Sequence, residues 1–92
     1  MKRFTKNYNF WEITYIDDIN EIIIRYGNND TNELTIMSGH DGNEWEMIIE
    51  NEVKSKIDNN WSNDDKNIMN KKDLIDIRLN LYNYDGTKKI QN

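Results

Sequence analysis

Three segments in the first half of the chain have an apolar residue at every second position, and only short turns separate them. This pattern runs through residues 10–15, 21–26 and 33–38, where the apolar residues are mostly aromatic or β-branched. This period of two predicts β-strands. Residues 17–20 and 27–30 between them are rich in Asp, Asn and Gly, which favour turns. Since hairpin connections of this length need no crossover, the sequence predicts an antiparallel meander.

The middle strand is expected to be buried on both of its faces. Ile22, Ile23 and Ile24 follow one another without a polar residue, whereas a strand with one wet face alternates along its length. Residues 21–26 are therefore predicted to form a central strand of the sheet.

A fourth strand is predicted over residues 44–49. The Asp–Gly pair in the preceding turn, residues 39–43, supports the positive φ angles of a hairpin. On a strand, Trp45, Met47 and Ile49 would share the face that packs on the core.

A change of period predicts a short helix over residues 51–61. Apolar residues recur there at every fourth position, which places them on one side of a helix. These residues are Ile49, Val53, Ile57 and Trp61.

Residues 75–81 are open to two interpretations. A strict alternation of Ile and Leu with polar residues favours a fifth strand. The alternative is a helix, because Leu74, Ile77, Arg78 and Leu81 also recur at helical spacing. Together these elements predict an α+β fold, an antiparallel β meander of four to five strands with one short helix packed on a face.

The size and composition of the chain indicate a single domain, residues 1–92. We expect residues 1–7 to be loose, and residues 87–92 to form either a short return strand or a frayed tail. Ala and Pro are absent while Asn, Ile and Lys abound, a codon bias typical of an AT-rich genome such as that of a low-GC bacterium or its phage. The chain contains neither a secretion signal nor an apolar run long enough to cross a bilayer.

Few residues of this chain could support catalysis or bind a metal. His40 is the only histidine, and there is no cysteine, so acid–base or transition-metal chemistry would depend on one imidazole. Residues 58–69 have oxygen ligands at the spacing of a calcium loop, but Asn63 replaces the glycine and Met69 replaces the glutamate that such a loop needs. We therefore expect no enzymatic activity, no metal and no cofactor.

The most distinctive feature for function is an acidic stretch, residues 41–52, with no Lys or Arg. It contains five carboxylates, Asp41, Glu44, Glu46, Glu50 and Glu52. On a strand, alternate residues lie about 6.8 Å apart on one face, so this stretch could present a row of negative charge resembling nucleic-acid phosphates. The simpler interpretation is a solvated strand face that keeps a small protein soluble.

Two tyrosines near the end of the chain are further candidates for contact with a partner. If residues 75–81 form a strand with Leu79 and Leu81 inward, Tyr82 and Tyr84 lie on its outward face. Tyr is enriched in protein interfaces, although a contact with the helix or a terminus would explain the pair equally well.

Three segments resemble the small acidic phage anti-CRISPR proteins that inhibit the type II effector nuclease. They are INEIIIRYGNND at residues 19–30, DGNEWEM at residues 41–47 and NNW at residues 59–61. The resemblance implies a sheet packed with helices, and inhibition by mimicry of the DNA beside the guide-recognised site. It also implies a phage origin and action in the cytoplasm of a host bacterium.

These observations predict a non-enzymatic inhibitor whose acidic face binds a basic nucleic-acid-binding surface of a host effector protein. An immunity protein or antitoxin that neutralises a cognate toxin would need the same surface. A small phage structural module that forms homo-oligomers through Tyr82 and Tyr84 is a third possibility. We expect a monomer or homodimer that binds neither nucleic acid nor membrane, because an acidic chain repels phosphate.

Overall fold

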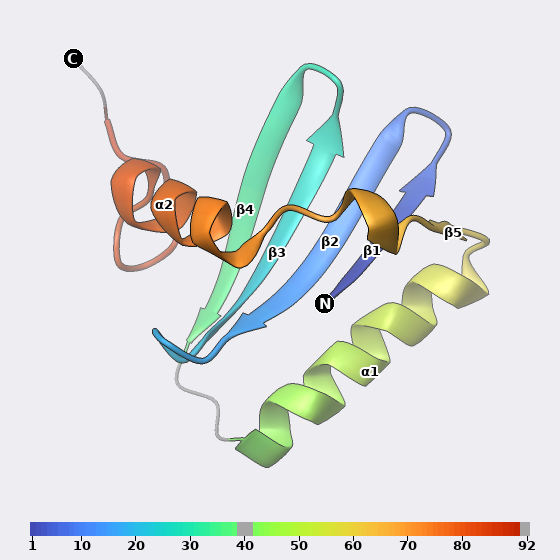
Figure 1. Cartoon of the computed structure of the whole chain (residues 1–92), viewed down its shortest axis with the longest axis horizontal. Helices are drawn as coiled ribbons and strands as arrows, with labels where there is room; N and C mark the ends of the chain where they lie inside the picture. The colour runs from blue at the N-terminus through green and yellow to red at the C-terminus, as the bar shows by residue number, and fades with distance from the viewer. Residues whose placement is uncertain (39–41, 91–92) are drawn as a thin grey trace.

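The computed structural model describes residues 1–38 and 42–90, which form an α+β fold with a five-stranded antiparallel sheet and two α-helices (Figure 1). The strands lie in the order β4-β3-β2-β1-β5. The elements are β1 (Lys2–Lys6), β2 (Asn9–Ile16), β3 (Glu21–Asn28), β4 (Thr31–Ser38), α1 (Gly42–Asp58), β5 (Ser62–Asn63), the 3-10 turn η1 (Asp65–Asn67) and α2 (Lys71–Leu81). The predicted fold class is confirmed.

The three predicted strands of the first half are present, and β3 lies between β2 and β4. Ile22, Ile23 and Ile24 are all buried, which confirms that this strand is covered on both faces. Successive side chains of a strand point to opposite faces, so the three isoleucines contribute to two separate cores.

The N-terminus is ordered, and the prediction that residues 1–7 are loose is wrong. β1 pairs with β2 along its whole length, with Phe4 opposite Trp11. Phe4 is buried, and its ring lies 6.3 Å from that of Trp11. Asn7 takes a φ of 57° in the tight turn between the two strands, a conformation that Asn tolerates. The buried Phe4 ring and this turn therefore hold β1 against β2, although the rest of β1 is basic and polar.

The helix α1 includes residues 44–49, so the prediction of a fourth strand there is wrong. Trp45, Ile48, Ile49 and Val53 pack against the core, and their spacing is that of one helix face. Met47 lies outside this face with 59% of its surface exposed, which corrects its expected place in the core. The helix predicted over residues 51–61 is confirmed only as far as Asp58, where α1 ends.

The helix α2 includes residues 75–81, so the fifth strand predicted there is wrong and the helical alternative is confirmed. Asn70 caps the helix, because its side chain accepts a 2.9 Å hydrogen bond from the Asp73 amide. Leu74 and Arg78, one turn apart, are both buried against the sheet.

The two helices cover opposite faces of the sheet. The α1-side core consists of Phe4, Trp11, Ile13, Ile22 and Ile24, and side chains of α1 pack against it. The α2-side core consists of Ile16, Ile23, Leu34, Leu74 and Tyr82. In Figure 1 the segment that leads into α2 crosses in front of the strands and α2 itself lies beside β4, whereas α1 lies below the strands.

The connection between the helices passes around the β1 edge of the sheet. β5 adds to this edge by pairing with β1, with Asn63 opposite Phe4. The chain then reaches the α2 side, where the backbone amide of Met69 donates to Oε1 of Glu12 at 3.3 Å. This route explains how two helices close in sequence come to lie on different faces.

The residues after α2 form a tight turn rather than a strand. The Asn83 amide donates to the Thr87 carbonyl at 2.6 Å, and Tyr82 forms a single β-bridge with Lys88. The return strand that was one possibility for residues 87–92 is therefore present only as this single bridge. Residues 91–92 lie outside the described part of the chain.

Candidate functional site

The acidic residues predicted to contact a partner lie on α1 rather than on a strand. Glu44, Glu46 and Glu50 are exposed, and Glu52 is half-buried. Asp41 and His40 lie outside the described residues.

The helix changes the geometry predicted for these carboxylates. Residues two apart on a helix are separated by about 200° around its axis, so Glu44 and Glu46 point to different sides and do not form the expected row. Glu46 and Glu50 are four residues apart, which places them on the same side with a rise of about 6 Å. Lys54 continues this line by one further turn. The row of negative charge is therefore a pair of carboxylates followed by a lysine.

The outward face of α1, which we define as Glu46, Met47, Glu50 and Asn51, combines negative charge with exposed apolar surface. The whole helix carries five carboxylates and two lysines, a net charge of −3 out of −5 for the chain. Met47 is exposed between the carboxylates, beside a shallow hollow of about 290 Å³ that it shares with Glu44, Ile48 and Asn51. This face could contact a basic surface that also has an apolar recess.

Aromatic contacts hold α1 in place at both ends. Trp45 stacks on Tyr15, with ring centroids 4.5 Å apart and an interplanar angle of 6°. At the other end the ammonium group of Lys56 lies 4.8 Å from the Trp11 ring and 5.0 Å from the Trp61 ring. Because the inward side chains are fixed in this way, the outward face of α1 is presented in one orientation.

Tyr82 and Tyr84 do not form the exposed aromatic pair that was predicted. Tyr82 follows a helix, so its ring turns into the α2-side core with only 4% of its surface exposed. Burial, together with the nearby charge of Glu33, raises the pKa of Tyr82 above its ordinary value of 10.0. Tyr84 is 91% exposed, and its carbonyl accepts a hydrogen bond from buried Arg78.

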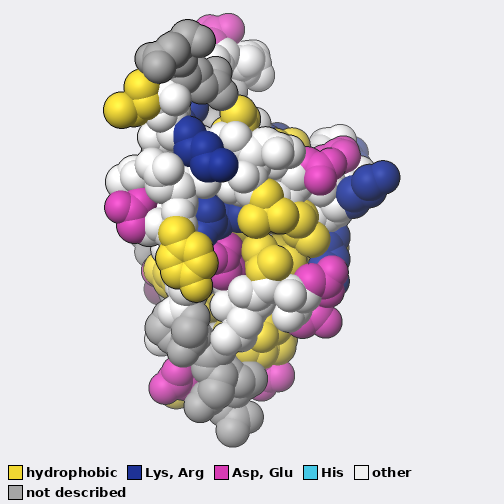
Figure 2. All heavy atoms as spheres, turned by 90° about the vertical axis from the view of Figure 1, so that its left-hand side faces the viewer, with side chains coloured by type: hydrophobic (Ala, Val, Ile, Leu, Met, Phe, Trp, Pro, Cys, Tyr) yellow, Lys and Arg dark blue, Asp and Glu magenta, His cyan; other side chains and the backbone are white. Residues whose placement is uncertain are grey.

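The side of the molecule formed by α2 and the β4 edge has a mixed surface. Figure 2 views this side, where hydrophobic side chains gather in the middle with charged side chains of both signs around them. Leu79, Tyr84 and Ile90 are the exposed large hydrophobic residues of α2 and of the described segment after it. This surface lacks the concentration of negative charge found on α1.

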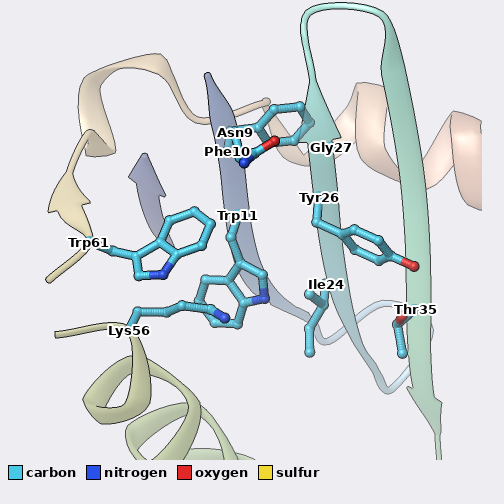
Figure 3. Close-up of a pocket in the computed structure, with 9 residues that line it drawn as sticks. All are labelled: Asn9, Phe10, Trp11, Ile24, Tyr26, Gly27, Thr35, Lys56 and Trp61. Atoms are coloured by element: carbon cyan, nitrogen blue, oxygen red, sulfur yellow. The ribbon is translucent and has the colours of Figure 1, made fainter. Parts of the chain in front are cut away.

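A groove on the α1 side of the sheet was not predicted. It has a volume of about 440 Å³ and is open to solvent between Trp61 and Lys56 on one side and Tyr26 and Thr35 on the other (Figure 3). The sequence has no signal for it, because Trp61 is 35 residues from Tyr26 and only the route of the chain around β1 brings them to one face. Residues at such separations are related by tertiary packing alone.

Buried ion pairs on the α2 side of the sheet were also not predicted. Glu12 accepts hydrogen bonds from Arg3 Nη1 at 2.6 Å and from Arg25 Nε at 2.9 Å. Glu21 accepts from Arg78 Nε at 2.8 Å. Each carboxylate is matched by at least one guanidinium, so these groups neutralise one another and join separate elements rather than form a reactive centre.

The described residues contain no group of three or more His, Cys, Asp or Glu side chains that could hold a metal ion. Within the same part of the chain, no helix is both long and apolar enough to span a membrane.

Comparison of the chain with protein-family models, with curated proteins and with solved structures finds no match. Function is therefore inferred from the outward face of α1 and from the groove on the α1 side of the sheet.

Proposed function

We propose that this chain is a non-enzymatic inhibitor, encoded by a phage, that binds a basic nucleic-acid-binding surface of a host effector protein. The observation that carries the proposal is the outward face of α1, where exposed Glu46 and Glu50 lie on the same side as exposed Met47. Among the described residues, neither of these two carboxylates forms an ion pair. Both are therefore available to lysine or arginine side chains of a partner.

Charge complementarity favours a protein partner over a nucleic acid. The net charge of −3 on α1 repels phosphate groups, and it attracts surfaces that have evolved to bind them. Such attraction increases the rate of encounter and is screened by salt over about 10 Å. Binding through this face is therefore expected to weaken as the salt concentration rises.

Met47 adds an apolar anchor to the charged groups of this contact surface. Interfaces are generally built from a few desolvated anchors surrounded by a polar rim, and methionine adapts its shape to irregular recesses. With Glu46 and Glu50 beside it, Met47 forms the centre of a small contact surface whose rim is acidic.

The type II CRISPR effector nuclease is the first target to test, because the chain resembles inhibitors of that enzyme in three segments. Purified chain is mixed with the guide-loaded nuclease, and both complex formation and target cleavage are measured. The double variant Glu46→Lys/Glu50→Lys reverses the charge of the proposed contact surface. We expect it to lower affinity and inhibition by at least about tenfold at low salt.

The matched control is Asp30→Lys/Asp76→Lys, which makes the same change in net charge at exposed positions outside α1. This variant is expected to inhibit as well as the native chain. Equal inhibition by the α1 variant and the native chain would contradict the proposed surface. If the native chain neither binds the nuclease nor slows cleavage, this target is excluded, and other phosphate-binding host effectors are tested with the same variants.

A further inference from the structure

The groove on the α1 side of the sheet has the composition of a small-molecule site. Its lining is mostly apolar and aromatic, with Trp11 and Ile24 between the two sides in Figure 3. The volume of about 440 Å³ falls within the range of ligand pockets, roughly 300–1,000 Å³. The groove shares no residue with the outward face of α1.

The positive charge of Lys56 favours a ligand with a negative charge in this groove. It is the only charged residue among the nine that line the groove, and its ammonium group lies near the faces of Trp11 and Trp61. The described part of the chain offers Lys56 no ion pair. A second cation in the groove would be repelled by this ammonium group, whereas an anionic group would gain a charge-assisted hydrogen bond.

Nearby charges reinforce this preference on the Trp61 side of the groove. Lys6 pairs across the strands with Asn9, which lines the groove, and its Nζ donates to the Asn59 carbonyl at 2.7 Å. Glu33 is opposite Tyr26 in the sheet, but it lies 3.9 Å from Nζ of Lys88. Glu52 lies one turn before Lys56 on α1, and its negative charge opposes anion binding.

The aromatic residues of the groove favour a flat ring. Trp61 is half-buried, and Tyr26 is 40% exposed on the opposite side. Stacking of a nucleobase on such side chains contributes about 1–3 kcal/mol per base and depends little on the identity of the base. Asn9 and Thr35 provide polar groups at the rim that can bond to the edge of a ring.

We propose that this groove binds a mononucleotide, with the base against Trp61 and Tyr26 and the phosphate beside Lys56. A free nucleotide suits the chain better than a nucleic-acid strand, because the net charge of −5 repels the many phosphates of a strand. The site is independent of the proposed inhibitory function, since each surface can be altered without the other.

The test is a binding titration of the native chain with AMP and UMP, with adenosine and uridine as uncharged counterparts. Calorimetry and tryptophan fluorescence both report binding. We expect each nucleotide to bind about tenfold more tightly than its nucleoside, as one charge-assisted hydrogen bond predicts. The variant Lys56→Gln should reduce this ratio to about one, while Lys56→Arg should retain it.

The matched control for charge is Lys54→Gln, a change on the same helix that leaves the ratio intact. Trp61→Leu and Tyr26→Leu are expected to weaken nucleotide and nucleoside alike, by about tenfold each. Circular dichroism establishes that every variant is folded before it is titrated.

Three results would overturn the proposal. The first is the absence of saturable binding of AMP and UMP at millimolar concentration. The second is a nucleotide-to-nucleoside ratio that is unchanged in folded Lys56→Gln. The third is tighter binding of a short oligothymidylate than of a mononucleotide, which would assign the groove to a strand rather than to a free nucleotide.

Discussion

The rings of Trp45 and Tyr15 stack almost in parallel, with centroids 4.5 Å apart. The contact joins the first turns of α1 to β2, and the Tyr15 hydroxyl continues it by donating to Asn20 Oδ1 at 2.8 Å. The acidic face of the helix is therefore held by an aromatic pair on its inward side.

Substitution of Trp45 by alanine is expected to destabilise the protein and to loosen the start of α1. The change removes a half-buried indole and its stacking contact, so we expect a loss of roughly 2–3 kcal/mol in the free energy of unfolding. Urea denaturation measures this loss. Met47→Ala, an exposed position two residues away, should change stability by less than about 0.5 kcal/mol; similar losses for both variants would show that the stacking contact contributes little.

Glu12→Gln is expected to destabilise the fold by roughly 3 kcal/mol, because it leaves two guanidinium groups without their shared carboxylate. Arg3 and Arg25 both bond to Glu12, and their guanidinium carbons lie 4.7 and 4.5 Å from the centre of the Phe10 ring. Thermal and urea unfolding check the value. A loss below about 1 kcal/mol would mean that the pairing barely offsets the cost of burying these charges.

The stability of the protein is expected to fall in acid partly through Asp64. Hydrogen bonding to the side chain of Arg3, at 3.0 Å from Nε, lowers the pKa of Asp64 below its ordinary value of 3.8. A carboxylate whose pKa is lower in the folded state adds stability above the unfolded value and loses it as the pH falls through the folded value. The free energy of unfolding should therefore decrease below about pH 3.8.

Urea denaturation of Asp64→Asn across this pH range isolates the contribution of Asp64. The variant should be less stable than the native chain at neutral pH, and the difference should vanish in strong acid. Asp76→Asn, at an exposed position on α2, serves as the control. Native and Asp64→Asn curves that stay parallel down to acid pH would contradict the predicted linkage.

Alanine is expected to be far less tolerated at Gly27 than at Gly86, although both glycines have positive φ. A Cβ atom at Gly27 would lie 2.3 Å from the Thr31 carbonyl oxygen, whereas one at Gly86 would lie 3.5 Å from Ile36 Cβ. Gly86→Ala should cost about 1 kcal/mol through backbone strain alone. Gly27→Ala should cost at least roughly 2 kcal/mol more, because backbone must also move. Equal losses in thermal unfolding would contradict this ranking.

The strands β2, β3 and β4 could be predicted from the sequence because their apolar pattern and their turns agree. Ile22, Ile23 and Ile24 indicate that the middle strand is buried on both faces, whichever elements cover it. The short turns between the strands favour antiparallel pairing. β1 was missed because Phe4 is its only buried residue, too few to show a period.

Residues 44–49 and 75–81 satisfy two periods at once, so their pattern alone does not decide between strand and helix. Trp45 and Ile49 fit one face of a helix as well as one face of a strand. Tertiary packing selects the helix at both segments. A sheet that is apolar on both sides requires two covering layers, and a helix at each segment covers one of these faces.

The α+β class, the antiparallel strands and the concentration of negative charge before and within α1 follow from residue patterns along the chain. That Glu44 and Glu46 point apart, that Tyr82 is buried, and that Trp61 faces a groove shared with Tyr26 became known from the folded arrangement alone. Periodicity shows which side of an element is apolar, whereas the neighbour of that side depends on how distant parts of the chain pack.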